Sequence, residues 1–213
     1  MKITKYGHCC LLIEINGKRV LTDPGSFSEG YEILTNLDVI VVTHEHADHL
    51  HISGVKTILK QNPKVTIVSN SSVAALLKTE GIDCEIIEGD SKAICAGVGL
   101  EAQDAQHVEI FEDYGIVQNT AYRIEQEFFY PGDSYAIPKE PVRVLALPVA
   151  GPWCKVTEAI HYALTVKPDI AIPVHDAILN DTGTNLHYRL FSTQLEKEGI
   201  TFTPLTEKEV TGL

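Results

Sequence analysis

Apolar positions along the chain mark out short strands near its amino-terminal end. Several strand-like segments within residues 2–23 are separated by turns, and Asn16-Gly17 between the last two is a pair that type I′ hairpins prefer. Residues 38–42, with the sequence DVIVV, form an uninterrupted apolar run, which is typical of a strand buried on both faces. The chain is therefore predicted to open with antiparallel hairpins and to continue into a buried strand.

Helical spacing of apolar residues follows this buried strand. Residues 52–62 place Val55, Ile58 and Leu59 on one face of a helix, and residues 71–81 begin with serines that can cap a helix and end at a glycine. Further helices are predicted at 156–168 and 185–199, strands at 64–70, 84–89, 142–151, 170–176 and 201–205, and longer regions of β structure at 92–107 and 120–133. A β-rich stretch thus passes into βαβ units twice, which predicts an α/β protein with two sheets and helices on their outer faces.

The length and composition are those of an ordinary globular protein, with 213 residues, 44% of them apolar and 22% charged. No linker interrupts the pattern, so a single domain over residues 1–213 is predicted. The first residues lack the apolar region of a signal peptide, and no apolar run approaches the ~20 residues that span a bilayer. Together with five scattered cysteines that form no C-x-x-C pair, these features favour a cytoplasmic protein with reduced thiols.

The chain is acidic, with 29 Asp and Glu against 17 Lys and Arg and a formal net charge of −12. This charge repels nucleic acid and anionic membrane surfaces. A small-molecule substrate is therefore expected, nucleic acid is disfavoured as a partner, and no membrane partner is expected. The oligomeric state is left open.

The strongest chemical signal is the stretch VIVVTHEHADHL at residues 39–50. It places His44, His46, Asp48 and His49 together at the end of a buried strand. Burying such groups without partners is unfavourable, and protonated histidines would repel one another. A shared cation resolves this conflict, because neutral imidazoles and a carboxylate are ligands that zinc, manganese and iron accept.

Other polar residues follow further predicted strands in the same way. Taken singly, each has an ordinary explanation as part of a turn or as a satisfied buried group. Together they place a possible ligand or orienting group at the carboxyl end of five strands: Asp23, His44, His107, Asp133 and His175. Because such strand ends share one edge of an α/β sheet, a single site at that edge is predicted.

In the order and spacing of these residues the chain resembles the metallo-β-lactamase superfamily, and the resemblance covers essentially the whole sequence. It implies a four-layer αβ/βα sandwich, with two mixed β-sheets, helices on the outer faces and a metal site on the rim between the sheets. It also implies two divalent metal ions. Zinc is the default by ligand type, and manganese and iron are alternatives.

The resemblance also implies a role for each residue of the site. The first metal would be held by His44, His46 and His107. The second would be held by Asp48, His49 and His175. Asp133 would bridge the two metals, and Asp23 would orient the ligands from behind. Such a metal pair lowers the pKa of a bound water toward 7, and Asp48 and Asp133 are the carboxylates expected to take part in catalysis.

A finer resemblance connects the chain with the lactonase-like branch of the superfamily, which contains many small metal-dependent hydrolases. The opening Gly7-His8-Cys9-Cys10-Leu11-Leu12-Ile13-Glu14 is similar to the start of that branch. The chain departs from the branch at Asp176, where an aromatic residue is common, so the specific substrate is not carried over.

Two residues near the predicted site keep alternative interpretations. His8 is expected to be catalytic by contacting the substrate or a metal ligand, and the alternative is that it caps a turn. Trp153 is the only tryptophan, and it either packs in the interior or forms a wall of the pocket.

The function favoured by these residues is that of a metal-dependent hydrolase acting on a small ester, lactone or phosphoester. Three alternatives share the same fold and remain open: a phosphodiesterase or nuclease, an iron-dependent redox enzyme, and a non-catalytic metal-binding scaffold. The acidic charge counts against a nuclease, and the complete set of ligands counts against a scaffold.

Overall fold

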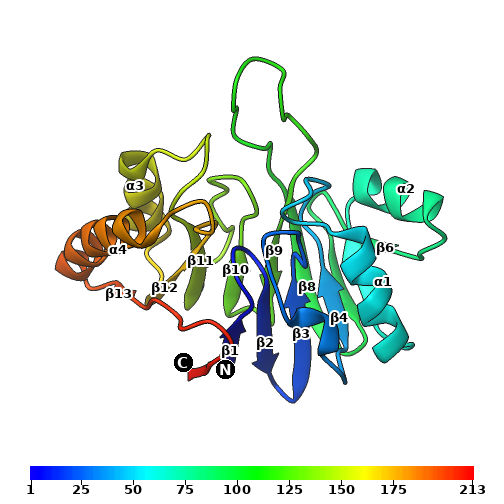
Figure 1. Ribbon diagram of the computed structural model, residues 1–213. Helices are drawn as coiled ribbons and strands as arrows, with labels where there is room; N and C mark the ends of the chain where they lie inside the picture. The colour runs from blue at the N-terminus through cyan, green and yellow to red at the C-terminus, as the bar shows by residue number, and fades with distance from the viewer.

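The computed structural model describes all residues from 1 to 213 and contains two seven-stranded sheets packed face to face (Figure 1). The strands of the first sheet are β1 (Lys2–Lys5), β2 (Leu11–Ile15), β3 (Lys18–Thr22), β4 (Val39–Val41), β5 (Thr66–Ser69), β6 (Glu85–Ile86) and β14 (Val210–Gly212). Their order is β14-β1-β2-β3-β4-β5-β6. Pairing is antiparallel from β14 to β3 and parallel from β3 to β6, so this sheet is mixed.

The second sheet repeats this arrangement. Its strands are β7 (Lys92–Cys95), β8 (Val98–Asp104), β9 (Thr120–Ile124), β10 (Phe128–Tyr130), β11 (Val144–Pro148), β12 (Ile170–Val174) and β13 (Thr201–Phe202). The order is β13-β12-β11-β10-β9-β8-β7. Pairing is antiparallel from β7 to β10 and parallel from β10 to β13.

Helices cover the outer face of each sheet. They are α1 (Ile52–Gln61), α2 (Ser71–Thr79), α3 (Val156–Val166) and α4 (Asp181–Leu195), with short 3₁₀ helices at Tyr31–Ile33 and Glu196–Glu198. Figure 1 places α1 and α2 on one side of the molecule and α3 and α4 on the other. None of the helices contains an apolar stretch of the length needed to span a bilayer.

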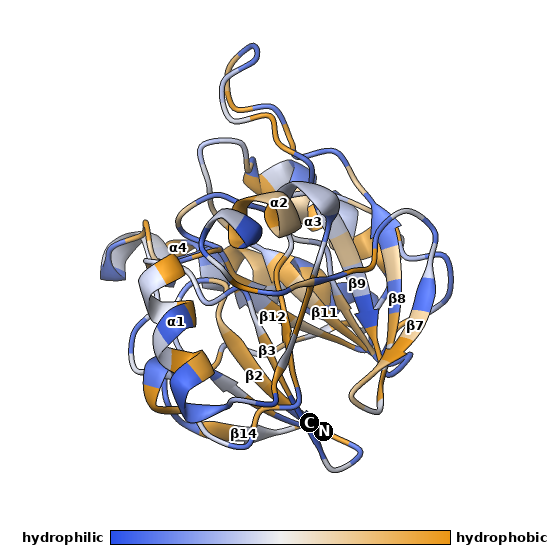
Figure 2. Ribbon diagram, turned by 90° about the vertical axis from the view of Figure 1, so that its right-hand side faces the viewer, coloured by the Kyte–Doolittle hydropathy of each residue, from blue (hydrophilic) through white to orange (hydrophobic).

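Alternating side chains on the buried strands divide the interior into layers. Val39 and Val41 of β4 pack between the two sheets, whereas Ile40 packs under α1 and α2. In the second sheet, Val144 packs between the sheets and Leu145 packs under α3 and α4. Both faces of these strands are therefore buried, which explains their continuous apolar runs. Figure 2 shows the apolar strands, in orange, lying inside the layer of helices.

The predicted fold class, a four-layer αβ/βα sandwich with two mixed sheets, is confirmed. Three local differences remain. The predicted β regions at 92–107 and 120–133 each contain two strands, because turns at Ala96 and Gly97 and at Glu125 and Gln126, all with positive φ, reverse the chain. Helix α4 starts at Asp181, before the predicted residue 185, because the side chain of Asn180 accepts a hydrogen bond from the backbone N–H of Gly183 and caps it. Strand β14 was not predicted.

Candidate metal centre

The predicted site residues lie where strands of both sheets end. In the first sheet, Asp23 follows β3, and the segment from His44 to His49 follows β4. In the second sheet, β8, β10 and β12 are followed by His107, Asp133 and His175. The loop at 105–119 between β8 and β9 begins beside the site and projects beyond the rim, where it is drawn in green (Figure 1). Residues from both halves of the sequence thus meet at one edge of the sandwich.

Two glycines allow the site loops to approach one another closely. A Cβ atom at Gly25 would lie 1.7 Å from the backbone oxygen of Asp48. At Gly132, where φ is +61°, a Cβ atom would lie 2.2 Å from Oδ1 of Asn119 and 2.8 Å from Cβ of Thr43. Any side chain at either position would push apart the loops that carry the candidate ligands.

The first cluster of candidate ligands consists of His44, His46, His107 and Asp133, whose ligand atoms all lie within 4.8 Å of one another. Nε2 of His44 is 3.1 Å from Nδ1 of His46, and Nε2 of His107 is 3.3 Å from Oδ2 of Asp133. Two ligand atoms bound to a tetrahedral zinc lie about 3.3 Å apart. These two separations are close to that spacing, so the cluster has a geometry suited to a metal ion.

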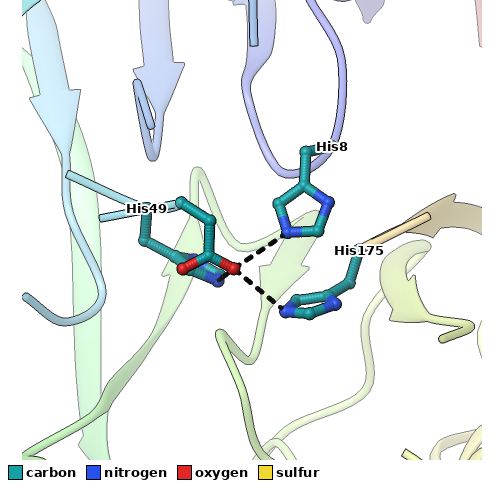
Figure 3. A group of neighbouring side chains, drawn as sticks. His8, His49 and His175 are labelled. Atoms are coloured by element: carbon teal, nitrogen blue, oxygen red, sulfur yellow. Dashed lines mark hydrogen bonds and ion pairs between the residues drawn. The ribbon is translucent and has the colours of Figure 1, made fainter. Parts of the chain in front are cut away.

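The second cluster consists of His8, Asp48, His49 and His175. Oδ2 of Asp48 lies 3.8 Å from Nε2 of His49 and 3.6 Å from Nε2 of His175. Figure 3 shows His8, His49 and His175 converging on one carboxylate. This cluster brings His8 next to the three ligands that the sequence predicts for the second metal.

Asp133 lies between the two clusters. Its Oδ1 is 3.1 Å from Nε2 of His49, and its Oδ2 is 3.1 Å from Nε2 of His175 and 3.9 Å from Nε2 of His44. The indole N–H of Trp153 donates a hydrogen bond of 2.9 Å to the same Oδ2. One carboxylate thus faces histidines of both clusters, as a bridging ligand would.

Buried polar atoms without hydrogen-bond partners show that the donor set suits a cation. Nε2 of His49, Nε2 of His107 and Oδ1 of Asp133 are all buried, and none makes a hydrogen bond with acceptable geometry, although the His49 and Asp133 atoms lie 3.1 Å apart. Leaving such atoms unpaired costs free energy, because burial removes the water that would otherwise bind them. Divalent cations bound by these atoms would satisfy all three.

Asp23 organises the site from behind. Its buried carboxylate accepts hydrogen bonds from the backbone N–H of Thr43 (2.8 Å), the hydroxyl of Thr43 (2.8 Å), Nδ1 of His49 (2.6 Å) and the hydroxyl of Tyr130 (2.8 Å). Because the Thr43 hydroxyl donates to Asp23, it accepts the Nδ1–H of His44 at 3.0 Å. Asp23 therefore directs Nε2 of both His44 and His49 toward the cluster.

His8 has a hydrogen-bonding arrangement that differs from that of the other histidines. Its Nδ1 accepts the backbone N–H of Ala177 at 3.3 Å, and burial, together with the neighbouring His175 and His49, lowers its pKa to about 4. A neutral ring with an accepting Nδ1 carries its proton on Nε2, which donates to Oδ2 of Asp48 at 3.2 Å. The side chain is fully buried and does not line the cavity at the site, so the structure places it behind Asp48.

The charges of the site suit metal binding. Burial and the neighbouring His49 hold the pKa of His44 well below its usual range, which keeps its Nε2 lone pair free. Burial would raise the pKa of Asp133, but His49 and His175 outweigh it, so the carboxylate stays ionised. Burial would lower the pKa of His49, but the carboxylates of Asp133 and Asp23 outweigh burial and raise this pKa well above its usual range. A cation that binds Nε2 of His49 would therefore replace a proton there.

Some contacts of the site residues were not predicted from the sequence. Tyr130 holds Asp23, and a buried ion pair of 2.5 Å between Lys5 and Asp176 fixes the turn that follows His175. Lys5 also donates to the backbone oxygen of Pro173 at 3.0 Å. These partners are more than 100 residues apart in the sequence, so no local pattern indicates them.

A family comparison agrees with the site geometry. Residues 2–175 match a family model described as a beta-lactamase superfamily domain. The chain belongs to this family. The matched region ends at His175, so it contains every predicted ligand, and the predicted membership of this superfamily is confirmed.

Relatives and solved structures extend this result. Protein Rv0786c of Mycobacterium tuberculosis is 33% identical over 193 residues, which cover 88% of this chain and 90% of that protein. A UPF0173 metal-dependent hydrolase of Methanospirillum hungatei is 33% identical over 116 residues, covering 54% of this chain and 48% of that protein. The structure is also similar to Igni18, a metallo hydrolase of Ignicoccus hospitalis, with a TM-score of 0.76, 18% identity and coverage of 100% and 98% of the two chains. At that identity the likeness supports the fold alone.

Proposed function

We propose that the protein is a metal-dependent hydrolase that uses two divalent cations to cleave a small ester, lactone or phosphoester. The observation that carries the proposal is the pair of His/Asp clusters that share the buried carboxylate of Asp133. The name of the Methanospirillum hungatei relative, a metal-dependent hydrolase, supports the same activity. Zinc is the proposed metal, because histidine nitrogens dominate both clusters.

The proposed ligands divide between the two clusters. His44, His46 and His107 would hold one cation, and Asp48, His49 and His175 would hold the other, with Asp133 shared between them. When bound, such a pair of cations supplies an activated water and polarises the oxygen of the bond under attack.

The protein's own groups prepare this chemistry by fixing the ligands. Asp23 orients His44 through Thr43 and orients His49 directly. His8 donates to Oδ2 of Asp48 and so limits rotation of that carboxylate. We therefore assign His8 the role of positioning Asp48, because its side chain does not reach the cavity. Within the superfamily, the opening from Gly7 to Glu14 supports placement in the lactonase-like branch.

Elemental analysis of protein purified without chelators or affinity metals tests this proposal. We expect about two zinc ions per chain and hydrolysis of esters, lactones or phosphoesters that is lost with chelator and regained with zinc. Reconstitution with manganese and with iron provides the comparison among metals. One iron per chain together with an absence of hydrolysis would favour redox chemistry, and a chain that binds no metal would contradict the proposal.

A further inference from the structure

The polar side chains of the cavity beside the two clusters are concentrated at the metal centre. The volume of this cavity is about 670 Å³, and most of its polar side chains are candidate metal ligands: His46, Asp48, Asp133 and His175. The other polar groups are the hydroxyl of Tyr114, on the loop at 105–119, and the indole N–H of Trp153, which already donates to Asp133. A substrate would therefore find its polar contacts at the metal centre and almost none elsewhere in the cavity.

Apolar side chains form the remaining walls of this cavity. They are Phe27 and Ile178, each 50% exposed, and, from the loop at 105–119, Ile110 and Tyr114, of which Tyr114 is 71% exposed. Trp153 is buried next to Asp133, and its ring lines the cavity. Exposed apolar side chains that gather around one cavity indicate a binding site for an apolar ligand group.

No lysine or arginine lines the cavity. The buried Lys5 lies behind the site and is paired with Asp176, so it offers no charge to a ligand. An adjoining pocket of about 440 Å³ shares Phe27 and Ile178, and its charged residues are Glu29 and Glu207. A phosphate or carboxylate placed away from the metals would thus have no cationic partner and would meet acidic neighbours.

We propose that the substrate is an uncharged ester or lactone that carries an apolar group beside the bond to be cleaved. This inference rests on the proposed hydrolase function and narrows its substrate class. One water is consumed: the acyl C–O bond breaks, the water oxygen bonds to the acyl carbon, and the alcohol oxygen takes a proton. The acid product loses its other proton at neutral pH, so the surrounding carboxylates favour its release.

Trp153 provides a direct binding assay, because it is the only tryptophan of the chain and it lines the cavity. The zinc-loaded protein is titrated with a γ-lactam bearing a hexyl chain and with the matched γ-lactam whose chain ends in a sulfonate. Lactams resist hydrolysis, and a sulfonate carries negative charge but coordinates metals weakly. We expect the hexyl compound to change Trp153 fluorescence and to bind roughly tenfold or more tightly than the sulfonate. Equal or tighter binding of the sulfonate, or no binding of either, would overturn the inference.

A charge introduced into the wall sharpens the test. Ile178→Lys should weaken binding of the hexyl lactam several-fold and strengthen binding of the sulfonate. Ile94→Lys is the matched control, because Ile94 is 80% exposed on β7 and does not line this cavity, and it should bind both ligands as the unchanged protein does. An unchanged preference in Ile178→Lys would show that the wall does not select the ligand.

Kinetics with the corresponding lactones separate this inference from the proposed function. A higher kcat/KM for the hexyl lactone supports both. Preferred hydrolysis of the sulfonate lactone would overturn the apolar assignment and leave the hydrolase intact. Selective binding of the hexyl lactam without hydrolysis of either lactone would support the cavity assignment and remove the proposed reaction.

Discussion

The two clusters of candidate ligands are supported in different ways. In the first cluster, His107 is held by the oxygen of its neighbour Val108 at 2.7 Å, and His46 is partly exposed at the cavity. In the second, His49 is held by the buried Asp23, and Asp48 is held by the buried His8. Distant buried partners thus hold two ligands of the second cluster directly, whereas Asp23 reaches His44 of the first cluster only through Thr43. The remaining histidine of the second cluster, His175, has a buried Nδ1 without a hydrogen-bond partner.

The largest effect is expected for Asp133, because its carboxylate faces the histidines of both clusters. Asp133→Ala should reduce metal content from about two ions per chain toward zero and abolish hydrolysis, because both clusters lose a ligand and a negative charge. Elemental analysis and turnover measured on the same preparation test this. Full metal content with unchanged turnover would refute the bridging role.

Removing one histidine from one cluster at a time should show whether each cluster binds its metal ion independently. His107→Ala and His175→Ala are each expected to retain about one metal ion per chain, and hydrolysis should fall by at least about 100-fold in both. Competition with a chromogenic chelator measures the number and the affinity of the ions that remain. Identical losses of both ions in the two variants would mean that the clusters do not bind independently.

The partner that supports both clusters should have a smaller effect on metal but a clear effect on stability. In Asp23→Asn an amide replaces a buried carboxylate that accepts four hydrogen bonds, so at least one donor loses its acceptor. We expect a loss of about 1–3 kcal/mol in the free energy of unfolding and metal affinity weakened about 10–100-fold. Denaturant unfolding of the metal-free variant isolates the first effect, and an unchanged midpoint would contradict it.

His8 can distinguish the two clusters, because its side chain contacts a ligand of the second cluster only. His8→Phe removes the donor to Asp48 and should weaken the second metal by roughly tenfold while leaving the first unchanged. His8→Gln, whose amide N–H can replace the Nε2–H, should restore part of that affinity. Equal weakening of both metals, or no rescue by glutamine, would argue for general damage to the fold.

The smallest effect is expected at a histidine outside both clusters. His161 lies on α3 and belongs to neither ligand group. His161→Ala should keep metal content and turnover within the error of the measurement, and it serves as the control for every variant above. A lost metal in this variant would mean that the ligands have been assigned wrongly.

The sequence predicted those parts of the molecule that depend on short-range order. The motif from His44 to His49 and the polar residues after buried strands are local features, and they indicated both the rim and the ligand set. The apolar runs likewise indicated the layers. The tautomer of His8 and the position of Trp153 beside Asp133 could not be predicted, because both depend on contacts between distant segments. The turns inside the two predicted β regions were not located, because Ala96, Glu125 and Gln126 adopt positive φ angles that non-glycine residues rarely adopt.

Each cluster combines residues from both sheets, and this affects when a metal ion can bind during synthesis and folding. His44, His46 and His49 lie in the part of the chain made first, but His107, Asp133 and His175 are synthesised later and arrive only when the second sheet docks. A nascent chain in which only β1 to β6 have formed therefore holds neither complete site. Metal capture would accordingly be a late event in biogenesis, and cations bound at these two sites would link the finished halves of the sandwich.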